Sequence, residues 1–253
     1  LIRLIFQIIA CIIIINFEIY IDNLGIYNFF DMLTFNLENL KIFGIFVTIF
    51  SILCLVNAFN FIDGIDGLAS SLIIIASITL LFFTFIYSSF NITNHLFLII
   101  FIYLNFLFLI FNKEIIMKFK IFYGDTGSTF IGFLFGWILI YYADLNQSFI
   151  HPVLAIWCIT LPIYDFLYVI IHRIQKKVNP FMPDNNHIHH IFFKKFNSKN
   201  MTLLLILSIS IIFNVIGLII FYLLGSFICL ISYVFLFILY FFGLNKFKYK
   251  YLS

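Results

Sequence analysis

Two amides and two carboxylates recur at every third position of the segment NAFNFIDGIDG. They are Asn57, Asn60, Asp63 and Asp66. Residues three apart share a helix face, so these side chains would form one polar strip. Carboxylates suit Mg²⁺, and amides suit the edge of a sugar or a base. A glycine follows each acid and would let the backbone approach a ligand. The alternative is a solvated, turn-rich loop, but the regular spacing favours a binding site.

A second polar segment, GDTGS at 124–128, is only superficially similar to a phosphate-binding loop. It lacks the full GxxxxGK[ST] pattern, which excludes a Walker-type site. Asp125 stands where an apolar stretch begins, near the positive end of the expected helix dipole. It could cap that helix, or it could present its carboxylate to a metal. Ser128, Gly132 and Gly136 follow at four-residue spacing, which permits close helix packing in lipid.

The third polar segment is PDNNHIHH at 183–190, with Asp184, His187, His189 and His190. Such a group could bind zinc, or it could supply protons and positive charge to phosphates. No cysteine lies near it, and lysines stand on both sides at 176–177 and 194–195. These neighbours favour contact with a phosphate or nucleotide over a structural zinc site or a plain basic loop.

Asp165 differs from these groups because it lies inside an apolar stretch. A carboxylate at that depth is a candidate for function, since an unpaired charge is costly in lipid. The alternative is a structural pair with Arg173 or with a neighbouring helix.

The elements that must position these groups are membrane-spanning helices. The chain is 64% hydrophobic and 10% charged, and its mean hydropathy is +1.16. These values exclude an ordinary soluble domain. The apolar runs are continuous rather than alternating, so they predict helices and not a β-barrel. We expect an all-α, polytopic bundle with about eight spans, each long enough to cross a bilayer, at 4–21, 41–57, 68–88, 96–112, 126–143, 152–171, 202–221 and 227–244.

The basic residues predict how this bundle is oriented. If the first residue is placed in the cytoplasm, 13 of the 14 lysines and arginines fall in cytoplasmic segments, and only Lys41 falls outside. Lysine and arginine in short loops favour the cytoplasmic side. The same threading brings all three polar segments to the cytoplasmic face, so we expect one site there.

Together these residues resemble the polyprenyl-phosphate N-acetylhexosamine-1-phosphate transferase superfamily (glycosyltransferase family 4). The family's NxxNxxDGxDGLA motif is similar to 57–69, its GDxGS motif to 124–128, and its PxxxxHIHH-type loop to 183–190. The stretch Leu161-Pro162…Asp165…Arg173 and the single-spaced HIHH are similar to the branch that contains the undecaprenyl-phosphate N-acetylglucosamine-1-phosphate transferases. The resemblance covers essentially the whole chain.

The resemblance implies transfer of N-acetylhexosamine 1-phosphate from a UDP-sugar to undecaprenyl phosphate, with release of UMP and with Mg²⁺ as cofactor, for which Mn²⁺ could substitute. It implies a multi-pass protein of the bacterial inner membrane, a cytoplasmic active site, and an initiating role in a cell-envelope glycan such as lipopolysaccharide. Its implied partners are these substrates and membrane lipid, with a homodimer allowed and no nucleic acid. The implied metal ligands are Asp125 and Asp63; the catalytic residues are Asp63, Asp66, His187, His189 and His190; the substrate-binding residues are Asn57, Asn60, Phe122, Asp184 and Arg173.

The chain departs from the family pattern at its start. We expect a single transmembrane transferase domain over 1–253 that lacks the family's first spans and their Asp-Asp pair. One alternative is therefore a catalytically inactive, truncated paralogue or assembly partner. A transporter with Asp165 and the histidines as a proton relay is a second alternative, but no internal repeat supports it. The identity of the sugar and the glycan pathway are left open by the residues.

Overall fold

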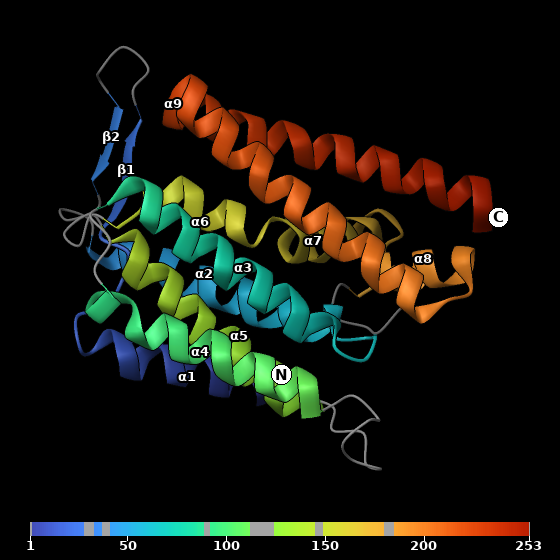
Figure 1. Ribbon diagram of the computed structural model, residues 1–253, viewed down its shortest axis with the longest axis horizontal. Helices are drawn as coiled ribbons and strands as arrows, with labels where there is room; N and C mark the ends of the chain where they lie inside the picture. Colours follow the sequence, from blue (N-terminus) through green and yellow to red (C-terminus); the bar gives the residue numbers. More distant parts are fainter. Residues whose placement is uncertain are drawn as a thin grey trace.

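The computed structural model describes residues 2–27, 33–36, 41–88, 92–111, 124–144, 149–179 and 185–252. All structural statements refer to these residues. Nine helices and one two-stranded hairpin lie within them (Figure 1). Their bounds are α1 Ile2–Ile15, β1 Asn23–Tyr27, β2 Leu33–Asn36, α2 Lys41–Ile62, α3 Leu68–Tyr87, α4 Ile92–Phe111, α5 Gly124–Ala143, α6 Pro152–Cys158, α7 Thr160–Gln175, α8 Ile188–Phe196 and α9 Lys199–Leu252.

The all-α membrane bundle predicted from the apolar runs is confirmed. Five of the described helices are long and apolar enough to cross a membrane, or six if the bent pair α6–α7 counts as one span. The predicted eight spans are reached only when the two arms of α9 are counted separately and the shorter α1 is included. The chain is a multi-pass membrane protein.

Helix α9 reverses direction at a glycine, so it forms a helical hairpin (Figure 1). Gly225 has φ 81° and ψ 175°, a conformation that side chains with a Cβ rarely adopt. The two arms pack against each other, as shown by the ring centroids of Phe213 and Tyr240, which lie 6.4 Å apart. The Sγ of Cys229 also donates to the carbonyl of Gly217 at 3.5 Å. The arms contain the predicted spans 202–221 and 227–244.

Helices α6 and α7, which cover the span predicted at 152–171, are bent by 74° relative to each other. Pro162 lies in the first turn of α7. It has no N–H to donate to the carbonyl of Cys158, the last residue of α6. A continuous helix would need that bond, whereas a proline in the first turn of a new helix costs no intrahelical bond. The bend is therefore placed where the sequence can best accommodate it.

The segment after α1 also differs from the prediction. Helix α1 ends at Ile15, before the predicted end at residue 21, and an antiparallel hairpin follows. Strand β1 pairs with β2 through Ile26 opposite Thr34 and Tyr27 opposite Leu33. Gly25 has φ 100°, and a Cβ there would lie 2.7 Å from the His151 ring. The hairpin thus packs on the start of α6.

Close packing between α2 and α5 sets the geometry of the polar end. A Cβ on Gly132 would lie 3.2 Å from the Cα of Val56, and one on Gly136 would lie 2.5 Å from Cδ1 of Ile52. The small-residue stripe expected on α5 therefore faces α2. The ends of α2 and α7 and the starts of α3 and α8 gather at one end of the bundle, opposite the β-hairpin (Figure 1).

Candidate active site at the polar end of the bundle

Helices α2 and α5 bring the first two polar segments into contact. The side-chain amide of Asn60 donates to Oγ of Ser128 at 2.9 Å and to Oδ1 of Asp125 at 3.3 Å. Ser128 in turn donates to the carbonyl of Gly124 at 2.9 Å, because its hydroxyl folds back along the first turn of α5. Asn60 thus holds the exposed Asp125 at the mouth of the bundle.

The predicted polar strip is only partly helical. Helix α2 ends at Ile62, so Asp63 and Asp66 lie in the tight turn that leads to α3. Gly67 closes this turn at φ 81°. Burial, followed by the charges of Asp66 and Asp125, raises the pKa of Asp63 from 3.8 to about 6. Two neighbouring carboxylates therefore act on Asp63, and a cation would relieve this repulsion.

The third polar segment reaches this turn through His189. A Cβ on Gly64 would lie 2.6 Å from Cδ2 and 2.8 Å from Cε1 of His189, and closer still to Nε2. Only glycine leaves room for the ring at this position. Neither ring nitrogen of His189 has a hydrogen-bond partner within the described residues. Burial lowers the pKa of His189 from 6.5 to about 3, so its ring is neutral near pH 7. A neutral ring could donate or accept a hydrogen bond, but it supplies no charge.

Asp165 pairs with the histidine segment and not with Arg173. Its Oδ2 lies 2.7 Å from Nδ1 of His187, and its Oδ1 accepts the N–H of Ile188 at 2.7 Å. Asp165 therefore pairs with the start of a neighbouring helix, α8, which was one of the two structural alternatives. Arg173 instead lies over the ring of Phe61, with Cζ 5.9 Å from the centroid. The Phe61 ring also lies 5.7 Å from the His187 ring and 5.8 Å from the Phe166 ring.

Asn57 lies one turn deeper than Asn60 and is held inside the protein. Its Oδ1 accepts a hydrogen bond from Nη2 of Arg3 at 3.0 Å, and its Nδ2 donates to the carbonyl of Leu53 at 2.7 Å. The geometry therefore links α1 to α2 through Asn57. Arg3 was not among the predicted site residues. One signal that could have found it is that the chain has only two arginines, and the other is Arg173.

Two further lysines reach the site and were missed from the sequence. Nζ of Lys199 lies 3.3 Å from Oδ2 of Asp66 in a surface pair that contributes little to stability. Nζ of Lys248, at the end of the second arm of α9, lies 3.4 Å from Nε2 of His172 and donates to Oδ1 of Asn186. Their spacing in the sequence carried no signal, because both belong to basic runs typical of membrane boundaries.

The predicted residues are thus brought together at one end, with two exceptions. Phe122 and Asp184 lie outside the described residues. Among the residues the structure describes, no three His, Cys, Asp or Glu side chains form a ready-made metal site. Mg²⁺ does not require one, since it usually binds one or two carboxylates together with waters and substrate phosphates. Asp63, with the carboxylates of Asp66 and Asp125 acting on it, fits that mode of binding.

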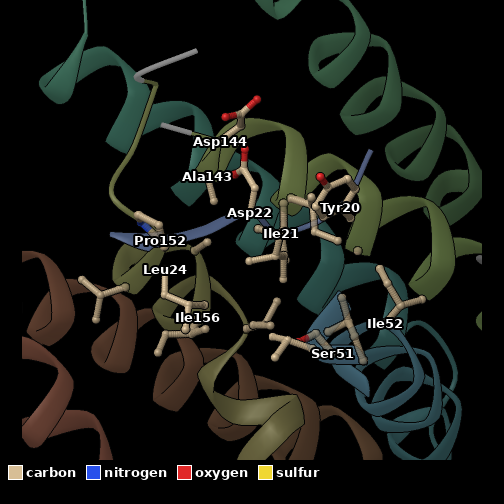
Figure 2. A pocket seen from close by; sticks show the side chains of 18 of the residues that line it. Tyr20, Ile21, Asp22, Leu24, Ser51, Ile52, Ala143, Asp144, Pro152 and Ile156 are labelled. Atoms are coloured by element: carbon tan, nitrogen blue, oxygen red, sulfur yellow. The ribbon is translucent and has the colours of Figure 1, made fainter. Parts of the chain in front are cut away.

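A separate, apolar cavity lies toward the other end of the bundle (Figure 2). It has a volume of about 380 Å³ and is lined mainly by aliphatic side chains of α2, α5 and α6. Asp22 and Asp144 border it side by side. Its lining is mostly apolar, with Tyr20, Asp22, Ser51 and Asp144 as the polar exceptions, so the polar end remains the candidate active site.

The known proteins that are similar to this chain point to the same kind of site as its geometry does. The model of the family described as glycosyl transferase family 4 matches residues 1–143. A protein of Escherichia coli (strain K12), named undecaprenyl-phosphate alpha-N-acetylglucosaminyl 1-phosphate transferase, is 31% identical over 201 residues, which are 78% of this chain and 53% of that protein. A protein of the same name from Yersinia pestis is 33% identical over 174 residues, 67% of this chain and 47% of its own length.

A third relative of the same name, from Haemophilus influenzae, is 37% identical over 100 residues, 40% of this chain and 28% of its own length. The chain spans about half the length of the first curated relatives it matches. No solved structure shows a significant match.

Proposed function

The chain belongs to glycosyl transferase family 4, and from this premise we propose that it transfers N-acetylhexosamine 1-phosphate from a UDP-sugar to undecaprenyl phosphate. The observation that carries the proposal is the meeting of three polar segments at one end of a membrane bundle. Asn60 contacts Asp125 and Ser128, and Gly64 packs against His189. Acids that suit a metal and histidines that suit phosphates thus share one site at the end of the bundle.

In the proposed reaction, a phosphate oxygen of the lipid attacks the β-phosphorus of the UDP-sugar. The new P–O bond forms as the bond to the bridging oxygen of the α-phosphate breaks, and UMP leaves with that electron pair. The products are UMP and a lipid-linked diphospho-sugar, which would initiate a cell-envelope glycan. No covalent enzyme intermediate is needed, so catalysis rests on positioning and on charge stabilisation.

The chain's own residues would divide this work. Asp125 and Asp63 would hold Mg²⁺, or Mn²⁺ in its place, and Asn60 would keep Asp125 in place. When bound, the metal would offset negative charge that develops on the leaving phosphate. Asp66, His187, His189 and His190 would complete the catalytic group around the pyrophosphate. Phe122, Asp184 and Arg173 stay predicted substrate contacts.

The proposed setting is the bacterial inner membrane, with the site in the cytoplasm. The support is the distribution of basic residues, 13 of which fall on the side of the three polar segments in the predicted threading. The polar end of the bundle would then lie where a soluble nucleotide sugar meets the phosphate of a membrane-borne lipid.

The test is a transfer assay with the full-length protein in detergent. Undecaprenyl phosphate, UDP-N-acetylglucosamine labelled in the sugar, and Mg²⁺ should give label in the lipid phase and an equal amount of UMP. Chelation with EDTA should stop both. If the folded protein binds UDP-sugar but releases no UMP with any N-acetylhexosamine donor, the inactive assembly partner becomes the better interpretation.

A further inference from the structure

The division of roles given above does not include one buried carboxylate, that of Asp165. Asp165 lies in the middle of α7 and is 1% exposed. It is in contact with the histidine segment, more than twenty positions later in the chain. A buried carboxylate needs strong partners, because burial of an unpaired charge is costly. Within the described residues, Asp165 makes two hydrogen-bond contacts of 2.7 Å with the start of α8, and Tyr240 of α9 also interacts with it.

The first partner is the backbone of α8. Ile188 is the first residue of this helix, and its N–H has no acceptor within the helix. His187, at the capping position, makes no side-chain cap hydrogen bond. Oδ1 of Asp165 accepts the Ile188 N–H at 2.7 Å instead. A carboxylate is also favourable at the positive end of the helix dipole. Asp165 therefore fixes where α8 begins.

The second partner is the ring of His187. A carboxylate can only accept, so Nδ1 of His187 must carry a proton to make the 2.7 Å contact with Oδ2. The other ring nitrogen, Nε2, is then the atom left for a ligand. Neighbouring rings fix the plane: His189 stacks on His187 with 5.6 Å between centroids and 11° between planes, and Phe61 lies 5.7 Å away.

We propose that Asp165 is a positioning residue for the transfer reaction. By holding Nδ1–H of His187 and the N–H of Ile188 together, it leaves Nε2 of His187 as a hydrogen-bond acceptor for a hydroxyl or N–H group of the UDP-sugar and sets the start of α8. His189, the residue after Ile188, then contacts Gly64 in the turn that contains Asp63 and Asp66, which we call the acidic turn. The role in transfer rests on the proposed function, whereas the hydrogen-bond geometry does not.

The test uses Asp165→Asn, which keeps shape and keeps an acceptor for Ile188. Its amide would donate to Nδ1 of His187, so the ring proton should move to Nε2. We expect kcat to fall about 10- to 100-fold, the loss that is typical when a group that orients a metal-binding histidine is removed. The KM for UDP-sugar should change less, since the ring stays in place. The matched control is Tyr168→Phe, which removes an α7 hydrogen bond to Asn245 and leaves both hydrogen bonds of Asp165 in place.

A double-mutant cycle separates positioning from an independent effect. If Asp165 acts through His187, then adding Asp165→Asn to His187→Ala should lower kcat by less than about twofold, although each single change is severe. Multiplicative losses would overturn the proposal, and so would a kcat for Asp165→Asn equal to that of Tyr168→Phe.

A second readout does not depend on activity. Nitrogen-15 NMR of histidine-labelled protein, assigned with His187→Gln, should show Nδ1 protonated in the unaltered protein and Nε2 protonated in Asp165→Asn. Unchanged spectra would contradict the pairing even if transfer is normal. If no variant and no unaltered protein transfers sugar phosphate, the proposed function fails, and the spectra alone decide whether Asp165 sets the state of His187.

Discussion

The close approach of Gly64 to His189 is open to a single substitution, Gly64→Ala. The added Cβ would lie 2.6 Å from Cδ2 of His189 and 2.8 Å from Cε1, whereas ordinary contact begins at 3.4 Å. The ring or the acidic turn must therefore move by about 1 Å, a displacement that can lower a rate about 100-fold when it disturbs a reacting geometry. We expect kcat for sugar-phosphate transfer to fall by about that factor.

Stability should change much less than the rate. Gly64 is exposed and lies in a turn, so the backbone can yield, and overpacking typically costs about 1–3 kcal/mol. The assay is UMP release at saturating UDP-sugar, together with thermal unfolding of the same preparation. The control is Gly243→Ala, because a Cβ at Gly243 meets nothing within 4 Å. Its rate should match that of the unaltered protein.

One result would refute this reasoning. If Gly64→Ala turns over within about twofold of the unaltered protein, the acidic turn and the histidine segment need not touch during transfer. A second substitution tests the same contact, because His189→Ala should make room for the methyl group that Gly64→Ala adds. The double variant should then be no slower than His189→Ala alone, since neighbouring changes that share one contact are not additive.

Three other predictions address the metal, the acids and the topology. Asp125→Asn keeps shape but removes a charge expected to hold Mg²⁺, so transfer should fall at least about 100-fold, or about 2.7 kcal/mol of barrier; near-normal activity would remove Asp125 from the metal site. Asp63 has its pKa raised from 3.8 to about 6 when folded, so the folded, metal-free protein binds its proton more tightly than the unfolded chain does. Its unfolding temperature should therefore fall as pH rises from about 4 to about 6 and level off above, and this part of the slope should be absent in Asp63→Asn. Single cysteines at Asn185 and Lys248 should react with an impermeant reagent from one side of the membrane, and one at Asn94 from the other; labelling of Asn94 and Asn185 from the same side would contradict the threading.

Much of the bundle was predictable because apolar length is a local property of the sequence. Helices α3 and α5 begin and end within a few residues of the predicted spans, and the Gly225 break separates the two predicted final spans. The β-hairpin was not predictable in this way. Its strands are four and five residues long and lack a strong alternation of apolar and polar residues, so only their pairing defines them.

The candidate site likewise has a part that the sequence predicts and a part that depends on how the helices pack. Regular spacing marked the residues that carry the chemistry, and the expectation that they meet at one end agrees with the contacts of Asn60 and Gly64. The residues that pair with these side chains could not be predicted. The pairing of Asp165 with His187, and of Asn57 with Arg3, joins residues far apart in the chain. Such pairs depend on how the helices pack, and spacing within one segment contains no information on them.

The reversal of α9 at Gly225 has a consequence for biogenesis. The second arm brings Lys248 back to His172 and Asn186, beside the histidine segment. Those residues are synthesised some sixty positions or more before Lys248. During synthesis and insertion, the first helices can therefore enter the membrane while the histidine segment still lacks one of its anchors. The polar end is complete only after the last arm has left the ribosome and packed against α7.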